Sequence, residues 1–176
     1  MKKFYISDIH LFHESVIADC NRPYQNIKEM HDDIIVRWNK KVCKNDIVYI
    51  IGDVASPSSE EELKGVVDIL RMLNGKKVLV IGNHDRESIK NFKFRKCFLD
   101  IKEYVRIYDG GKKVVLFHCP MEFWEGDKKG VIHIHGHVHN EPINKKINRY
   151  NAGVDVLGFE PKTLNEIVAL NKEDVF

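Results

Sequence analysis

Residue types that bind metal ions recur in short blocks along this chain of 176 residues. The blocks combine carboxylate, imidazole and amide side chains, often beside a glycine: Asp8-x-His10, Gly52-Asp53, Gly82-Asn83-His84-Asp85, His118 and Gly136-His137-x-His139. Such ligands form borderline-hard sites that suit manganese, iron, zinc or nickel, whereas magnesium prefers oxygen ligands and water. The blocks therefore predict a transition-metal site without thiolate ligands.

A pair of such ions would suit phosphoryl chemistry. A carboxylate such as Asp53 can bridge two cations. Two cations roughly 3.5–4 Å apart polarise a phosphoryl group and lower the pKa of a bridging water, and the resulting hydroxide can attack phosphorus in line with the leaving oxygen. The residue types thus favour hydrolysis of a phosphoester.

The elements that must position these blocks are strands, because nearly every block directly follows a predicted strand. Apolar, β-branched runs at 3–7, 47–51 and 78–81 predict buried strands, and each ends at a ligand block. Ligand-type residues at the carboxyl ends of successive strands converge on one edge of an α/β sheet. Glycine lets the backbone turn sharply there, so that a short side chain can point back into the crevice.

Helical periodicity separates the first three strands. The spacing of apolar residues predicts a helix over 27–42, and Ser59 with Glu62 has the spacing of a capping box that opens a second helix, which Gly75 ends. This alternation predicts a parallel sheet in the first half of the chain.

The second half is predicted to be mostly strands, with a last helix after the capping pair Thr163 and Glu166. Residues 101–108 and 113–117 flank the turn Asp109-Gly110-Gly111, and further strands are predicted at 131–135, 147–151 and 154–156. We expect antiparallel pairing here. The expected fold is α/β, a layered α/β/β/α sandwich of two mixed β-sheets flanked by helices, forming a single domain over residues 1–176.

Composition excludes several other classes of protein. Hydrophobic residues make up 43% and charged residues 31%, as in an ordinary globular protein, and the formal net charge of +2 is too small to indicate nucleic-acid binding by itself. No signal peptide or membrane-spanning stretch is apparent, so we expect no membrane partner. The four cysteines form no C-x-x-C pair, which favours a reducing, cytoplasmic location. The oligomeric state is left open.

Together, the five blocks occur in an order that resembles the calcineurin-like metallophosphoesterases over residues 8–139. The segments 21–23, 38–39 and 150–155 look like a small bacterial or phage-type branch of that family. The resemblance implies two metal ions, which share Asp53. One would be held by Asp8, His10, Asp53 and His139, and the other by Asp53, Asn83, His118 and His137.

The resemblance also implies that His84 contacts the substrate and protonates the leaving group, although orienting the substrate would need the same position. We expect Asp85 beside it to keep His84 protonated. His13 is a candidate substrate contact, with a surface or ligand-supporting role as its alternative. We expect His135 to pack behind the ligands and orient them.

The stretch Val54-Ala55-Ser56-Pro57 departs from the family's serine/threonine phosphatases, which carry Asp and Arg soon after the Gly-Asp block. Arg22 or Arg86 would then clamp the phosphate instead. We expect a phosphodiester or nucleotide-type small molecule as substrate rather than a phosphoprotein, with manganese as the first choice of metal and iron, zinc or nickel as alternatives. The alternative functions are a nuclease acting on DNA or RNA, or a binding or scaffold module of the same fold with weak catalysis.

Overall fold

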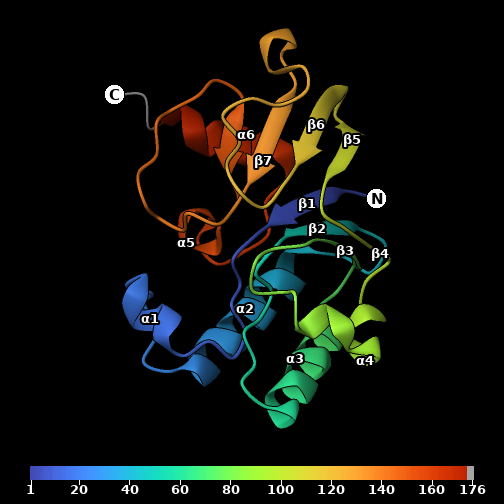
Figure 1. Cartoon of the computed structure of the whole chain (residues 1–176), viewed down its shortest axis with the longest axis vertical. Helices are drawn as coiled ribbons and strands as arrows, with labels where there is room; N and C mark the ends of the chain where they lie inside the picture. Colours follow the sequence, from blue (N-terminus) through green and yellow to red (C-terminus); the bar gives the residue numbers. More distant parts are fainter. Residues whose placement is uncertain (174–176) are drawn as a thin grey trace.

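A computed structural model describes residues 1–173, with side chains described as far as Leu170. Two four-stranded sheets stack on each other, with helices on the outside (Figure 1). The first sheet has the order β1-β2-β3-β4, and all of its neighbouring strands are parallel. Its strands are β1 (Lys3–Ile6), β2 (Ile47–Ile51), β3 (Lys76–Val80) and β4 (Asp100–Lys102).

The second sheet has the order β5-β6-β7-β8, and its pairing differs from the antiparallel arrangement expected. Only the hairpin pair β5–β6 is antiparallel, whereas β6–β7 and β7–β8 are parallel. The reason is that two long loops, 117–131 and 136–148, carry the chain back without a crossover helix, so that consecutive strands run in the same direction. The strands are β5 (Val105–Asp109), β6 (Lys112–Leu116), β7 (Ile132–His135) and β8 (Arg149–Asn151).

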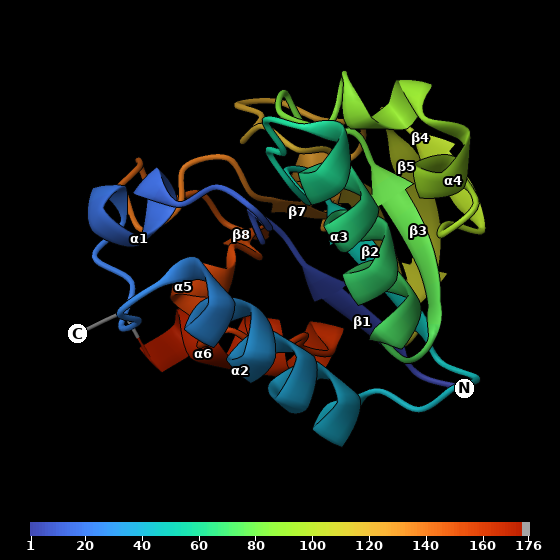
Figure 2. The same cartoon turned by 90° about the horizontal axis from the view of Figure 1, so that it is seen from below.

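Alternation along β1 explains how the layers hold together. Phe4 and Ile6 point to the outer face, where they join a core with Ile34 and Trp38 of α2, while Tyr5 points between the two sheets. Figure 2 shows α2 and α3 crossing the outer face of the first sheet. The helices are α1 (Ser15–Asp19), α2 (Ile27–Lys41), α3 (Glu60–Met72), α4 (Phe92–Arg95), α5 (Val154–Leu157) and α6 (Leu164–Glu173).

The capping pairs predicted from sequence do start helices. The Ser59 side chain accepts the backbone N–H of Glu62 at the start of α3, and the Thr163 N–H and hydroxyl both donate to the Glu166 carboxylate at 2.7 Å at the start of α6. Over the described residues, no helix is both long and apolar enough to cross a membrane.

Two predicted strands were wrong in detail. Residues 154–156 belong to the single turn of α5, because the chain turns after Gly153 and the Leu157 N–H bonds back to the Gly153 carbonyl in helical fashion. The predicted strand 101–108 is divided between β4 of the first sheet and β5 of the second, so this stretch carries the chain from one sheet to the other.

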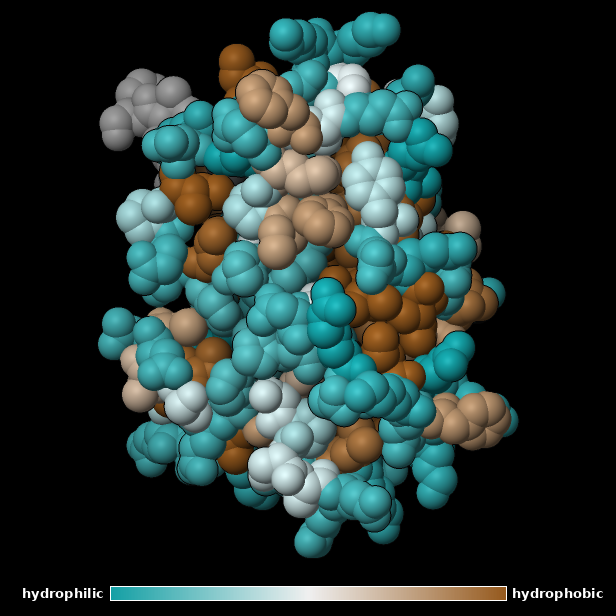
Figure 3. Space-filling view, viewed as in Figure 1, coloured by the Kyte–Doolittle hydropathy of each residue, from teal (hydrophilic) through white to brown (hydrophobic). Residues whose placement is uncertain are grey.

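The sandwich is open where β4 and β5 form the edges of their sheets. Ile47, Val78, Leu99, Val105 and Ile107 contribute to a groove at this edge. Figure 3 shows hydrophobic surface on the corresponding face, surrounded by hydrophilic side chains. This groove lies apart from the ligand blocks, which follow the carboxyl ends of the strands.

Candidate metal centre and active site

The carboxyl ends of β1, β2 and β3 meet those of β6 and β7, and the predicted ligands follow directly after them. Several of these residues have left-handed backbone conformations, which are uncommon outside glycine and persist only where the surrounding structure enforces them. Their φ values are 57° at Asp8, 55° at His10, 54° at Asp53, 74° at His137 and 47° at His139. The fold thus uses strained turns to point successive ligands into one crevice.

Glycines make room for these turns. A Cβ atom on Gly82 would lie 2.2 Å from Oδ1 of Asp53, and one on Gly136 would lie 2.3 Å from Oδ2 of Asp8. Both distances are far below van der Waals contact. The glycines of the Gly-Asn-His-Asp and Gly-His-x-His blocks therefore allow the backbone to pass directly against the carboxylates of other blocks.

The first cluster of ligands consists of Asp8, His10 and His139, whose ligand atoms lie within 4.8 Å of one another. Asp8 is fully buried, and its two carboxylate oxygens accept the backbone N–H of His137 at 3.0 Å. His10 is also buried, and its Nε2 atom has no hydrogen-bond partner among the described residues.

The electrostatics of this cluster fit a bound cation. Burial raises the pKa of Asp8 to about 6, because the carboxylate has lost water. Burial also lowers the pKa of His10 to about 2, so the imidazole is neutral. A buried ring nitrogen without a partner is costly, and a cation coordinated by Nε2 and the nearby carboxylate would satisfy it.

The second cluster consists of Asp53, His118 and His137, again with ligand atoms within 4.8 Å of one another. The Asn83 Oδ1 atom lies 3.1 Å from both Nε2 of His118 and Nδ1 of His137, so the amide joins this cluster. Asp53 Oδ2 lies 3.3 Å from His118 Nε2 and 3.7 Å from His10 Nε2. Asp53 therefore stands between the two clusters, and the structure brings all seven predicted ligands together.

Asp53 and His118 form a buried pair that stabilises both charges. Burial alone would lower the pKa of His118, but its contact with Asp53 outweighs this and raises the pKa to about 9. Burial likewise disfavours the charged carboxylate of Asp53, yet the contact with His118 and the N–H of His84 lower its pKa to about 2. In a metal-loaded site, the cation would take the place of the imidazole proton.

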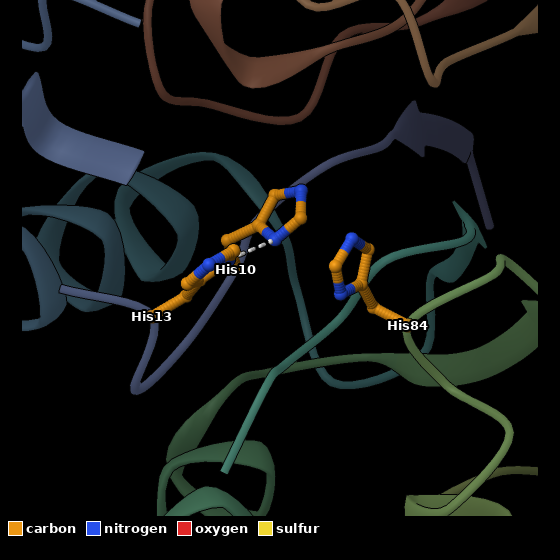
Figure 4. A group of neighbouring side chains, drawn as sticks. All are labelled: His10, His13 and His84. Carbon is orange, nitrogen blue, oxygen red and sulfur yellow. Dashed lines mark hydrogen bonds between the residues drawn. The ribbon is translucent and has the colours of Figure 1, made fainter. Parts of the chain in front are cut away.

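Three imidazoles face one another at the open side of the first cluster (Figure 4). His13 Nδ1 lies 3.0 Å from His10 Nδ1. The exposed ring of His84 has its centroid 5.1 Å from that of His10 and 5.4 Å from that of His13. The structure thus places both candidate substrate-contacting histidines beside the ligands, on the side open to solvent.

Two expectations are corrected. Asp85 does not face His84. Its buried carboxylate instead accepts the backbone N–H groups of Gly82, Asp53 and Val54 at 2.8–2.9 Å, which fixes the turns after β2 and β3.

Arg22 is not placed to clamp a phosphate. Its side chain is fully buried, and its guanidinium donates to the carboxylate of Asp155, the carbonyls of Asp8 and Ile9, and the Met30 sulfur. These contacts engage all five N–H donors of an arginine. Arg86 is exposed, as a substrate contact requires.

Asp155 and Asn151 were missed as functional residues. Asp155 accepts a hydrogen bond from Nδ1 of His139 at 2.9 Å, which raises the pKa of His139. Burial opposes ionisation of Asp155, but this bond and Arg22 lower its pKa. Asn151 Nδ2 donates to the His139 carbonyl at 2.7 Å. The available signal was the resemblance of segment 150–155 to the small bacterial or phage-type branch of the family, but nothing in the sequence connects this segment with Arg22.

His135 and His133 lie behind the ligands, on the outer face of the second sheet. His135 is buried with Nδ1 2.9 Å from the Gly136 carbonyl oxygen, next to the ligand turn. His133 Nε2 accepts the Met121 N–H at 3.1 Å, so it supports loop 117–131. Trp124 of that loop is buried and donates to the Val131 carbonyl.

Comparison with known proteins identifies the family. A solved structure of a protein of unknown function from Aquifex aeolicus matches with a TM-score of 0.74 at 27% identity, covering 96% of this chain and 98% of that one. Nuclease MPE of Pseudomonas putida shares the fold, with a TM-score of 0.52 at 18% identity over 78% of this chain and 60% of that one. An uncharacterized protein of Methanocaldococcus jannaschii is 37% identical over 177 residues, covering 97% of this chain and 92% of that protein. A model of the calcineurin-like phosphoesterases matches residues 1–160. Because this match includes every ligand block, the chain belongs to the calcineurin-like phosphoesterase family, whose members are metal-dependent phosphoric ester hydrolases.

Proposed function

We propose that this protein hydrolyses a phosphodiester or nucleotide-type phosphoester with a pair of transition-metal ions, manganese being the first choice and iron, zinc and nickel the alternatives. The observation that carries the proposal is the position of Asp53 between two clusters of ligands, 3.3 Å from His118 and 3.7 Å from His10. A carboxylate in that position can be shared by two cations.

The chain's residues divide between the two ions on either side of Asp53. Asp8, His10 and His139 would complete one site, and Asn83, His118 and His137 would complete the other. When bound, the ions would supply Lewis acidity to the phosphoryl group and lower the pKa of a coordinated water. The protein's part is to aim the ligands inward, which the strained turns achieve, and burial holds the His10 imidazole neutral.

His84 is proposed as the proton donor to the leaving oxygen. Its backbone N–H donates to Oδ1 of Asp53 at 2.9 Å, so its position is fixed relative to the metal centre while its ring stays exposed. General acids must lie within hydrogen-bond reach of the leaving group. His13 and Arg86 are the further candidates for contact with the substrate.

A diester or nucleotide-type substrate is favoured over a phosphoprotein. The stretch after Asp53 holds Val54 and Ala55, both fully buried, where the family's serine/threonine phosphatases carry an acid and an arginine. Arg22, the other candidate near the centre, is engaged inside the protein. Recognition of phosphate therefore depends on the imidazoles and the ions rather than on a buried arginine clamp.

The test is hydrolysis of a chromogenic phosphodiester and of the matching monoester by metal-stripped protein, with and without added manganese. We expect manganese-dependent turnover with a preference for the diester. Salt-sensitive cleavage of DNA or RNA in the same buffer would favour the nuclease alternative. Absence of turnover with manganese, nickel, iron and zinc would favour a binding module.

A further inference from the structure

Residues 151–155 hold His139 at two points, although no ligand block includes them. Asn151 Nδ2 donates to the His139 carbonyl at 2.7 Å, and Asn151 Oδ1 accepts the Gly153 N–H at 2.8 Å. The Asp155 Oδ2 atom lies 2.9 Å from His139 Nδ1. Because an ionised carboxylate can only accept, Nδ1 carries the proton, and Nε2 of His139 is left as the atom that can bind a metal.

Asp155 is fixed in turn by Arg22. Nε of Arg22 donates to Oδ1 of Asp155 at 2.8 Å and Nη2 donates to Oδ2 at 3.0 Å, which is the two-bond arrangement that orients a carboxylate most firmly. The Arg22 and Asp155 side chains are 0% and 3% exposed. A pair this deeply buried gains little stability overall, since both charges have lost water, so stability alone does not account for it.

The remaining donors of Arg22 indicate a further role. Nη2 donates to the Asp8 carbonyl at 2.8 Å, and Nη1 donates to the Ile9 carbonyl at 3.0 Å. These carbonyls belong to the turn that carries the ligands Asp8 and His10. The contacts therefore run from His139 through Asp155 and Arg22 to the turn after β1, joining ligand segments that lie more than a hundred residues apart in sequence.

The turns so joined need external support. Asp8, His10 and His139 all have φ between 47° and 57°, a conformation that costs free energy for a residue with a side chain. The second cluster is held differently: its buried pair, Asp53 and His118, consists of two ligands, and Asn83 contacts His118 as well. Asp155 and Arg22 thus support the first cluster and not the second.

We infer that Asp155, with Arg22 and Asn151, positions the metal site formed by Asp8, His10 and His139, by fixing the orientation of His139 and the turn after β1. This inference rests on the proposed function, since it assumes that the cluster binds a cation. Asp155 is a positioning residue, because it acts through His139 and touches neither substrate nor reacting atoms. If this inference is right, the two metal sites can be weakened separately.

The experiment measures manganese binding to the metal-stripped full chain by isothermal titration calorimetry, with wild type and Asp155→Asn. We expect wild type to bind two ions. In the variant, affinity at one site should fall roughly 10-fold to 100-fold, the usual effect of removing a partner of a metal-ligating histidine, while the other site is unchanged. Diester hydrolysis by Asp155→Asn should recover in part at high manganese concentration.

The matched control is Glu166→Gln, which weakens an ion pair with Lys41 far from the ligands. It should lower the melting temperature without changing either affinity. If Asp155→Asn fails to fold, Arg22→Lys replaces it, because lysine keeps the charge but cannot reach the carboxylate and both carbonyls together; the same site should weaken, by a smaller factor. A folded variant that binds both ions as tightly as wild type overturns the inference, whereas wild type that binds no ion overturns the proposed function.

Discussion

At the scale of single residues, Asp53 and His84 lie close together, but replacing each of them should have a different effect on metal content and turnover. Asp53→Asn removes the charge that stands between two imidazole clusters, so metal content and turnover should be lost together. His84→Asn leaves the ligand atoms in place and should retain both ions, while turnover falls roughly 100-fold to 10,000-fold, the range for loss of a general acid.

Metal content by mass spectrometry, measured beside the turnover of a substrate with a poor leaving group, separates these two outcomes. Full activity of His84→Asn on such a substrate would show that His84 is not the acid. It would leave His84 with the alternative role of orienting the substrate.

Gly136 offers a second prediction at this scale, because its contribution is the absence of a side chain. A Cβ atom there would lie 1.9 Å from Oγ of Ser7 and 2.3 Å from Oδ2 of Asp8. Gly136→Ala should therefore displace Asp8, weaken manganese binding and destabilise the fold by about 1–3 kcal/mol, as overpacking does. Chemical unfolding and calorimetry measure the two effects.

The control for Gly136 is Gly110→Asn in the β5–β6 turn. Gly110, unlike Gly136, has a positive φ, which asparagine tolerates, and a Cβ atom there would meet nothing within 4 Å. Manganese affinity should be unchanged. Equal effects of the two substitutions would contradict the steric explanation.

At the scale of elements, Asp85 shows how the ends of two strands are fixed together. Its carboxylate accepts one N–H after β3, from Gly82, and two after β2, from Asp53 and Val54. Asp85→Asn keeps the shape but turns an NH₂ group toward a backbone donor. Loss of a hydrogen bond to a charged group predicts destabilisation by about 1.5–3 kcal/mol, together with weaker metal binding, because Asp53 belongs to one of these turns.

Urea unfolding of Asp85→Asn is compared with that of Asp127→Asn. Asp127 is half-buried and its side chain accepts the neighbouring Lys128 N–H in a short helical turn, so its substitution should change stability by no more than about 0.5 kcal/mol. If the two variants unfold at the same urea concentration, the carboxylate of Asp85 does not fix the turns.

The elements also show what the sequence could and could not predict. Local signals were sufficient for the helices at 27–41 and 60–72, where apolar spacing and the Ser59 cap act within a few residues. Strand direction in the second sheet was not predictable, because long loops rather than helices return the chain. The ligands were predicted because their blocks follow predicted strands and occur in the order of the family that the sequence resembles. Asp155 was not, since its role depends on Arg22, 133 residues away in sequence.

At the scale of the whole molecule, the candidate metal centre joins the two sheets. Asp8, Asp53 and Asn83 follow strands of the first sheet, whereas His118 and His139 follow strands of the second. Bound ions would therefore link elements that otherwise meet through the core between the sheets, and unfolding would have to release them. Metal binding and global stability should be coupled.

Removing metal with a chelator should consequently lower the melting temperature of the whole chain. A ligand that binds only the folded state stabilises that state by about 2.7 kcal/mol when its free concentration is 100 times its dissociation constant. In a chain of this size that corresponds to a shift of roughly 5–11 °C. Calorimetric scans of stripped protein with increasing manganese should show one transition moving upward. Asp53→Asn should not show this shift. A rise of equal size in the variant would mean that manganese stabilises the protein elsewhere, and that the ions do not hold the two sheets together through Asp53.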